Sequence, residues 1–405
     1  MLTARLSDGT VISVAGRGNL SYLKWLRSRE SFYCRLCGER VILKVGTKRI
    51  PHFAHERGSF CTDSFEPESE YHLQGKLQLF EWLQRENLSP RLEVYFPRIR
   101  RRADIVFEFG GKTYCLEFQC AVLPEEEFIQ RTKGYRSLSL EPLWILGGKN
   151  IQRKSSQKFS ISGFQYLFLQ MTAGNHLYLP AYCPETKKFI FLTNIFPVSV
   201  RSALAGLTAK PLQAARIDDL FCPTSATQLS VGKWREEMER FKTTFLRNRN
   251  LFNSDFVKEL YSLSVHPLLL PPYVGIPLSL NPVIEESPFI WQGYVFLDCL
   301  FGKKQGECFS FAGAYLSLLK RIEKKQLRSR QLPNINKTLL PFLLFEYLQV
   351  LTHQGILHKA GKDVFYISND IVLFRTAAES AREEARFYSQ FSIRQCFDGR
   401  DVFNT

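Results

Sequence analysis

Three things are missing from this 405-residue chain, and each absence excludes a class of protein. Residues 1–8 contain no apolar stretch of the kind that a secretory signal needs. The most apolar window, residues 266–272, contains three prolines, which indicates a loop and not a membrane span. No Gly-x4-Gly-Lys-Ser/Thr sequence occurs, which argues against ATP hydrolysis. We therefore expect a cytoplasmic protein with no membrane span and no ATPase site.

Acidic residues are scarce as well. The chain has 39 Asp and Glu against 54 Lys and Arg, a formal net charge of +15 at pH 7. Residues 1–62 alone hold eleven basic residues against four acidic ones. This excess predicts a polyanionic partner, bound through phosphate contacts and the release of counterions. The ten cysteines, in a chain without a signal, indicate a reduced cytosol, and the length indicates two or three domains.

The most informative stretch is a predicted hairpin, residues 101–109 and 112–119, joined by Gly110 and Gly111. Alternation along a strand places Glu117 and Gln119 on one face, while Asp104 lies on the preceding strand. An unpaired Glu117 among apolar neighbours would lose hydration at a cost of several kcal/mol, so a cation is the natural compensation. A carboxylate pair on a rigid hairpin can ligate Mg²⁺ or Mn²⁺. The alternative is an exposed hairpin with ordinary surface acids.

The flanking segments predict the rest of this domain. Residues 68–86 have the pattern of an amphipathic helix with Leu73, Leu77 and Phe80 on one stripe, and the same stripe directs Glu70 inward. Pro124 opens a second helix, because proline suits the first turn and the acids that follow suit the helix dipole. The expected elements are a helix 68–86, a strand 92–96, the hairpin, a helix 124–137 and a strand 142–146. Their order is αβββαβ.

That order, with Asp104 followed by Glu-x-Gln, resembles the PD-(D/E)xK nuclease superfamily. The run from Cys-x2-Cys and His-Phe-Ala-His through Glu-Ser-Glu-Tyr-His-Leu-Gln-Gly-Lys to Leu-Glu-Phe-Gln resembles the competence protein CoiA family, over residues 30–150 above all. The resemblance implies a restriction-nuclease-like domain that acts on DNA after uptake in bacterial transformation. It makes Asp104, Glu117 and the Phe118 carbonyl the Mg²⁺ or Mn²⁺ ligands, with Glu70 assisting.

Gln119 departs from the superfamily pattern, which has lysine there. A neutral amide can orient the attacking water but cannot offset developing charge. Arg131 or Lys133 could supply that charge, although phosphate binding without catalysis is the role we favour for them. Arg131 and Tyr135 share a helix face at i,i+4. The expected phosphate-binding residues are Arg100, Arg101, Arg102, Arg131 and Lys133.

The N-terminal region has metal-ligand spacing of its own. A two-residue gap lets Cys34 and Cys37 direct both thiolates at one ion. Residues 41–45 and 50–53 can form a hairpin that brings His52 close, and His55 or Cys61 would complete a tetrahedral zinc site. The spacing favours Cys34, Cys37 and His52 for three of the four positions. The alternative is a reduced cysteine pair with surface histidines.

The remainder of the chain gives weaker signals. Residues 176–183 and 188–192 predict a hairpin that extends or covers the nuclease sheet, and residues 200–230 have the composition of a connection. From Trp234 onward the pattern is mainly helical. A basic, aromatic helix over 234–252 fits a surface helix better than a nucleic-acid track. The further expected helices are 289–300, 312–322 and 339–352.

A hairpin around residues 360–362 follows the last of these helices, which resembles a winged-helix arrangement. The 339–352 segment is too apolar to read bases in a groove, so we expect packing or protein interaction. The predicted fold class is mixed α/β (α+β). The predicted domains are a basic zinc-binding domain (1–62), a nuclease-like domain (63–200), a connection (201–230) and a mainly helical domain (231–405).

The predicted function is Mg²⁺- or Mn²⁺-dependent hydrolysis of DNA during transformation and recombination. The expected partner is single-stranded or branched DNA, with recombination proteins as further partners. A catalytically inactive DNA-binding recombination mediator is the alternative. Gln119 favours the mediator, whereas Asp104 and Glu117 favour the enzyme.

Overall fold

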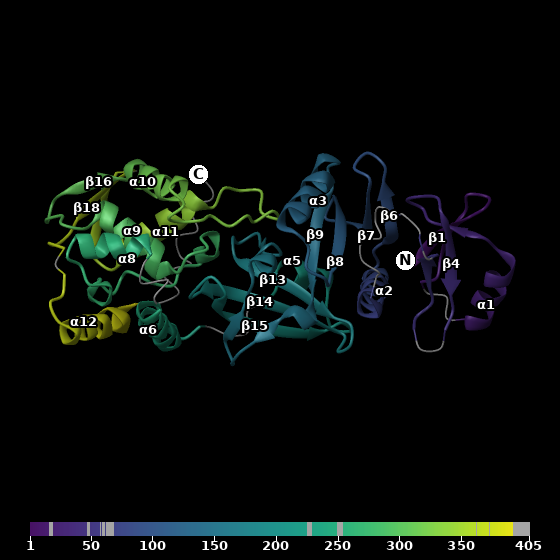
Figure 1. Cartoon of the computed structure of the whole chain (residues 1–405), viewed down its shortest axis with the longest axis horizontal. Helices are drawn as coiled ribbons and strands as arrows, with labels where there is room; N and C mark the ends of the chain where they lie inside the picture. Colours follow the sequence, from purple (N-terminus) through teal and green to yellow (C-terminus); the bar gives the residue numbers. More distant parts are fainter. Residues whose placement is uncertain are drawn as a thin grey trace. The chain divides into compact units, whose positions relative to one another are not determined.

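The computed structural model describes residues 1–15, 19–46, 49–56, 58, 61, 69–224, 229–248, 254–361, 363–371 and 373–391 (Figure 1). These residues form two compact units. The first comprises Met1–Ile151, Leu179–Phe191 and Ala209–Thr224, and the second comprises Gln152–Tyr178, Leu192–Thr208 and Ser225–Thr405. Three predicted element boundaries, at Glu68, Phe252 and Lys362, lie outside the described residues.

The N-terminal lobe, residues 1–61, is a five-stranded sheet in the order β2-β1-β3-β4-β5 with one helix. Its elements are β1 (Thr3–Leu6), β2 (Val11–Ser13), α1 (Leu20–Arg29), β3 (Phe32–Tyr33), β4 (Arg40–Lys44) and β5 (His52–His55). The predicted hairpin is confirmed, because β4 pairs with β5 in antiparallel register. Alternation along β4 and β5 buries Val41, Leu43 and Phe53. The main chain of Phe53 also bonds to Met1, so the start of the chain is held in this sheet.

The predicted αβββαβ order is confirmed in the next part of the first unit. Its elements are α2 (Glu70–Arg85), β6 (Arg91–Phe96), β7 (Arg101–Phe109), β8 (Lys112–Gln119), α3 (Glu125–Ser137) and β9 (Glu141–Gly147). Strands β6, β7 and β8 are antiparallel neighbours, and β9 lies parallel to β8. Gly110 and Gly111 have φ angles of 57° and 73°. This left-handed conformation is the one that a two-residue hairpin turn requires.

Helix α2 turns a different face to the sheet than the apolar pattern predicts. Leu73 is buried, but Leu77 and Phe80 are only partly buried. The buried stripe instead consists of Leu73, Gly75, Lys76, Leu79, Trp82 and Leu83. Gly75 explains the difference, because a Cβ atom there would lie 2.0 Å from Cε1 of Phe118. The helix therefore approaches β8 closely at a glycine, and Lys76 enters the interior.

The residues after β9 continue the sheet, whose order is β10-β11-β15-β14-β13-β9-β8-β7-β6 with β12 beside β13. The further elements are β10 (Gln152–Arg153), β11 (Lys158–Ser160), α4 (Gly163–Tyr166), β12 (Gln170–Met171), β13 (Leu177–Cys183), β14 (Lys188–Pro197), β15 (Ser202–Pro211) and α5 (Ile217–Phe221). The predicted hairpin of residues 176–192 is thus confirmed as an extension of the sheet.

The predicted connection at 201–230 is wrong, because it contains β15 and α5. Strand β15 carries alanine, glycine and leucine in place of β-branched residues, so its composition indicates no strand.

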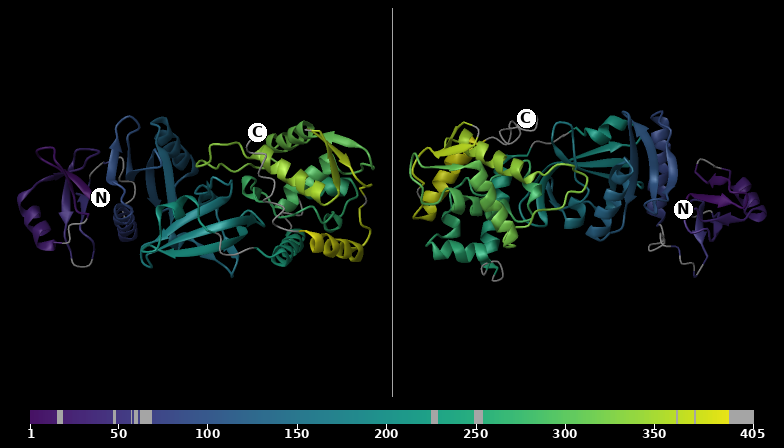
Figure 2. Two further views of the ribbon diagram at one scale, coloured as in Figure 1. Left: turned by 180° about the vertical axis from the view of Figure 1, so that it is seen from behind. Right: turned by 90° about the horizontal axis from the view of Figure 1, so that it is seen from above.

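The C-terminal domain is mainly helical, as predicted. Its elements are α6 (Val231–Arg247), α8 (Asp255–Ser262), α9 (Pro288–Cys299), β16 (Cys308–Ser310), α10 (Phe311–Glu323), α11 (Leu340–His353), β17 (Leu357–Ala360), β18 (Val364–Ile367) and α12 (Ala377–Gln390). The strands pair in the order β16-β18-β17. Figure 2 shows the helices of this domain, coloured green to yellow, from two further sides. The succession from α9 to β18 is that of a winged helix. Most residues of α11 are buried, so this helix packs inside the domain.

Within the described part of the chain, every helix is too short or too polar to cross a membrane.

Candidate carboxylate site and cysteine-histidine cluster

Three acidic residues lie in one row across β6, β7 and β8. Leu92 pairs with Ile105, and Ile105 pairs with Leu116. Glu93, Asp104 and Glu117 directly adjoin these paired residues, at the point where the regular pairing of β6 with β7 is interrupted and that of β7 with β8 ends. Regular pairing of β6 with β7 resumes at Val94 and Ala103, and Glu93 between them has a φ angle of 51°. The row therefore coincides with a local distortion of β6.

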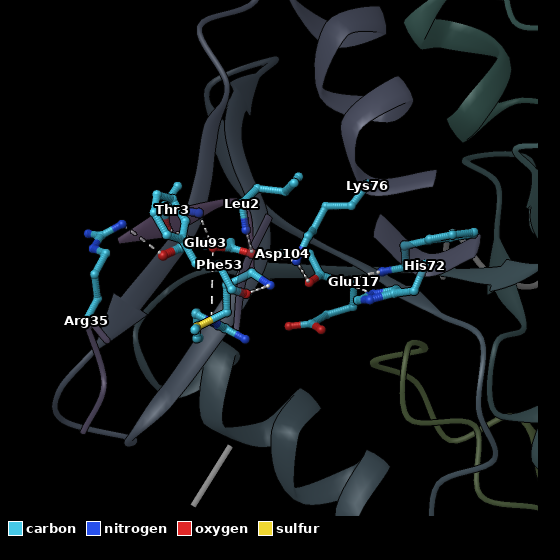
Figure 3. Close-up of polar contacts among 12 residues, drawn as sticks. Leu2, Thr3, Arg35, Phe53, His72, Lys76, Glu93, Asp104 and Glu117 are labelled. Carbon is cyan, nitrogen blue, oxygen red and sulfur yellow. Dashed lines mark hydrogen bonds and ion pairs between the residues drawn. The ribbon is translucent and has the colours of Figure 1, made fainter. Parts of the chain in front are cut away.

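Asp104 is held by groups from both β8 and α2 (Figure 3). Its Oδ2 accepts a hydrogen bond from the Phe118 N–H at 3.0 Å and lies 3.3 Å from Nε2 of His72. Its Oδ1 lies 3.5 Å from Nζ of Lys76. The Asp104 side chain is 13% exposed. Contacts on both oxygens fix the orientation of this carboxylate.

Glu117 is 2% exposed and faces helix α3. Its Oε2 lies 2.6 Å from a guanidinium nitrogen of Arg131, and its Oε1 accepts a hydrogen bond from the Tyr135 hydroxyl. Burial lowers the pKa of Arg131, but Glu117, Tyr135 and Asp104 raise it more, so the net shift is upward. Burial and Glu117 raise the pKa of Tyr135. Arg131 thus stays charged and Tyr135 stays protonated at neutral pH, and both bind the Glu117 carboxylate.

Glu93 is fully buried and accepts hydrogen bonds from the N-terminal strand. Its Oε1 accepts from the Leu2 N–H, and its Oε2 accepts from the N–H and the hydroxyl of Thr3, each at 2.8 Å. Its Oε1 also lies 2.6 Å from Nζ of Lys76. The Glu93 carbonyl accepts a hydrogen bond from Arg35 at 3.1 Å. Glu93 is therefore the point where the N-terminal lobe meets the carboxylate row.

Two predicted site residues have other partners. The Gln119 amide donates to the Ala121 carbonyl at 2.9 Å, so it stabilises the turn after β8.

Glu70 does not point inward as predicted, because its side chain is 37% exposed. Its Oε1 accepts a hydrogen bond from Gln74, and its Oε2 lies 3.9 Å from Arg49. The difference follows from the rotation of α2 described above, which turns His72 and Lys76 toward Asp104.

The predicted phosphate-binding residues fall into two groups. Arg100 and Lys133 are exposed. Arg101 lies 3.4 Å from Glu127, and Arg102 lies 4.0 Å from Glu93. Arg131 contacts Glu117 and lies over the Trp144 ring. Arg101, Arg102 and Arg131 therefore each lie beside a carboxylate, whereas Arg100 and Lys133 present their charge to solvent.

A second cluster lies in the N-terminal lobe. Ligand atoms of Cys34, Cys37, His55 and Cys61 all lie within 4.8 Å of one another. Gly38 has a φ of 77° and donates its N–H to the Cys34 carbonyl at 3.0 Å, closing the turn that carries both cysteines. Two thiols, a third thiol and an imidazole in such a group form a donor set that suits tetrahedral zinc.

His52, which the spacing favours, is not one of these four. Its Nδ1 lies 2.9 Å from the Ile50 carbonyl. His52 and His55 stand three residues apart on β5, so alternation directs them to opposite faces of the strand. The cluster consequently uses His55 and Cys61 together.

The sequence reasoning missed three residues of the carboxylate site: His72, Lys76 and Glu93. His72 and Lys76 have i,i+4 spacing on α2, so they share a helix face. This spacing could have indicated from the sequence that both side chains point the same way. Glu93 carried no local signal, because its left-handed backbone and its partners at residues 2 and 3 depend on distant parts of the chain. The shared face of Arg131 and Tyr135 is confirmed, and Glu117 is where both side chains meet.

The site therefore belongs to an αβββαβ domain with acids on its central antiparallel strands, which is the arrangement of a nuclease-like domain. Comparison with protein families agrees: residues 68–225 match the nuclease-like domain of competence protein CoiA. Residues 18–64 match its N-terminal domain, and residues 229–381 match its C-terminal domain. The chain is 30% identical over 347 residues to competence protein CoiA of Bacillus subtilis (strain 168), covering 84% of this chain and 90% of that protein.

The chain belongs to the competence protein CoiA family. No solved structure matches it.

Proposed function

We propose that this protein is a metal-dependent deoxyribonuclease that processes DNA in the cytoplasm during transformation and recombination. The observation that carries the proposal is the presence of Asp104 and Glu117 on the neighbouring strands β7 and β8 of a nuclease-like domain. The family match and the name of the Bacillus relative support a role in competence. The net charge of +15 supports a polyanionic substrate.

The donor set fits a hard divalent cation. Asp104 and Glu117 would hold Mg²⁺ or Mn²⁺ with the Phe118 carbonyl, since carboxylate and carbonyl oxygens are the ligands these ions prefer. When bound, such an ion lowers the pKa of a water molecule and stabilises charge on a phosphodiester. The chain itself orients both carboxylates, Asp104 through Phe118 and His72, and Glu117 through Arg131. The exposed Arg100 and Lys133 would hold DNA phosphates beside the site.

The test is cleavage of labelled single-stranded, duplex and branched DNA with Mg²⁺ or Mn²⁺. Asp104→Ala and Glu117→Ala are each expected to lower the rate by about a thousandfold or more, roughly 4 kcal/mol of transition-state stabilisation. Glu108→Ala is the matched control, because Glu108 is an exposed acid on the same strand β7. Cutting that survives in both site variants would contradict the proposal.

For the N-terminal cluster we propose a structural zinc ion held by Cys34, Cys37, His55 and Cys61. A small lobe gains much of its stability from such an ion. The purified protein is expected to contain about one zinc per chain, and Cys34→Ser to lose it. Cys222→Ser is the control, because Cys222 is an exposed thiol outside the cluster. Equal zinc content in wild type and Cys34→Ser would exclude this site.

The second candidate function is DNA binding without cleavage, by a recombination mediator. Gln119 favours it, because a neutral amide brings no charge to the position of the superfamily lysine and one of its N–H groups already binds the Ala121 carbonyl. In that case, wild type would bind DNA and cut none of the three substrates with either metal. DNA binding would then be equal in wild type and Asp104→Ala.

A further inference from the structure

Helix α2 buries a lysine beside the carboxylate row. Lys76 is 0% exposed, and its Nζ lies 2.6 Å from Oε1 of Glu93 and 3.5 Å from Oδ1 of Asp104. Lysine is almost never fully buried unless it is paired. The two carboxylates therefore define where this ammonium group sits, between Glu93 and Asp104 (Figure 3).

Glu93 is itself held firmly in place. Three donors from Leu2 and Thr3 reach its two oxygens at 2.8 Å. Its backbone has the left-handed conformation that is uncommon for residues other than glycine, and such a conformation persists only where surrounding contacts impose it. The contact from Arg35 to the Glu93 carbonyl adds a second attachment to the N-terminal lobe. The ammonium of Lys76 is thus positioned by the start of the chain.

The charged groups along the row show why the position of Lys76 matters. Three carboxylates, Glu93, Asp104 and Glu117, lie on the neighbouring strands β6, β7 and β8. The guanidinium group of Arg131 pairs with the Glu117 carboxylate at 2.6 Å. Arg102 lies 4.0 Å from Glu93, at the limit of an ion pair. Nζ of Lys76 lies 3.5 Å from Oδ1 of Asp104.

We propose that Lys76 is a positioning residue of the nuclease site, and that it supplies beside Asp104 the positive charge that Gln119 does not carry. This proposal rests on the proposed function, since it assigns Lys76 a role in DNA cleavage. Glu93 and strand β1 hold the ammonium group 3.5 Å from Oδ1 of Asp104. The positive charge reduces repulsion between the carboxylate row and an approaching phosphodiester.

This role predicts an effect on turnover and not on DNA affinity. Lys76 has no exposed surface, so it cannot contact a DNA phosphate in this structure. A buried ion pair with a purely structural role makes a different prediction. Replacing both of its partners by uncharged residues of similar size is often tolerated, and cutting would then be unchanged.

The experiment compares three variants of the full chain in single-turnover cleavage at saturating metal. Lys76→Met with Glu93→Gln removes the ammonium without stranding a buried carboxylate. Its rate is expected to fall about a hundredfold, with the Kd for DNA within about threefold of wild type. Lys76→Arg keeps the charge and is expected to cut at least about tenfold faster than the double variant. The control is Lys158→Met with Glu237→Gln, a pair at 2.5 Å in the second unit in which the glutamate is buried and the lysine is partly exposed, and it is expected to cut like wild type.

A folded double variant that cuts within about threefold of wild type would overturn the role of Lys76 while leaving the nuclease intact. Absence of cutting by wild type would overturn the nuclease, and the role of Lys76 with it. If the double variant fails to fold, the single variant Thr3→Val tests the proposal instead. It removes only the hydroxyl that donates to Glu93 and is expected to slow cutting about threefold, whereas an unchanged rate would contradict the positioning by β1.

Discussion

The nuclease-like domain and the C-terminal domain each bury a glutamate that accepts two backbone N–H bonds, and they differ in how the charge is compensated. Glu93 binds the N–H groups of Leu2 and Thr3 and also pairs with Lys76. Glu346, on α11, binds the N–H groups of Ser279 and Leu280, and no cation pairs with it among the described residues. Burial raises the pKa of Glu346 to about 7. Two backbone donors therefore do not cancel the upward pKa shift that burial causes at Glu346, and at Glu93 the fold adds a buried lysine.

The largest expected effect is a loss of stability when the lysine that pairs with the buried Glu93 carboxylate is removed. Lys76→Met alone strands Glu93 and should destabilise the nuclease-like domain by about 3–5 kcal/mol. Hydrogen–deuterium exchange of peptides from β7 and β8 measures this. Adding Glu93→Gln should restore most of the protection. Equal protection in wild type and the single variant would show that the ion pair contributes nothing to stability.

The second prediction concerns Glu346, whose pKa lies above the usual value of 4.5 for a glutamate in an unfolded chain. The folded state therefore holds its proton more tightly, and its advantage is fully present below pH 4.5. Stability should fall as the pH rises from about 4.5 through 7, by about 3 kcal/mol in total. Urea unfolding of the C-terminal domain at several pH values measures the slope. Glu346→Gln should flatten it, and an unchanged slope would assign the effect to another group.

The third prediction tests the close approach that brings Lys76 to the row. Gly75→Ala places a Cβ atom 2.0 Å from the Phe118 ring, so either α2 or β8 must move. A loss of about 1–3 kcal/mol is expected, together with slower cutting, because the same movement displaces Lys76 and His72 from Asp104. Gly163→Ala is the control, since open space surrounds that helical glycine. Thermal unfolding that is the same for Gly75→Ala as for wild type would contradict the contact.

The smallest effect is expected at the surface, where charges are solvated and not compensated by the fold. Lys133→Ala should weaken DNA binding a few-fold and reduce the slope of log K against log salt by about one. Lys304→Ala, an exposed lysine of the C-terminal domain, is the comparison. Binding titrations at several salt concentrations measure both slopes. Identical slopes for Lys133→Ala and wild type would remove Lys133 from the DNA-binding surface.

Much of the nuclease-like domain was predictable because its signals are local. The strand pattern of 101–119 with two glycines at its centre, and the acid-rich start of α3, specify their elements without help from distant residues. The rotation of α2 was not predictable from apolar spacing. Leu77 and Phe80 fit a helical stripe as well as the buried residues do, and the close contact of Gly75 with Phe118 decides between the two faces.

The sequence by itself determined the αβββαβ order, the placement of Asp104 and Glu117 on neighbouring strands, and the pair Cys34 and Cys37 with their two-residue gap. Only the tertiary structure decided that His55 and not His52 joins that pair, that Glu70 faces solvent, and that Lys76 and Glu93 stand beside Asp104. Periodicity reports which residues share a face of one element. The partner of that face is set by packing between elements, and here the N–H groups of Leu2 and Thr3 reach Glu93 from 91 and 90 residues away in the chain.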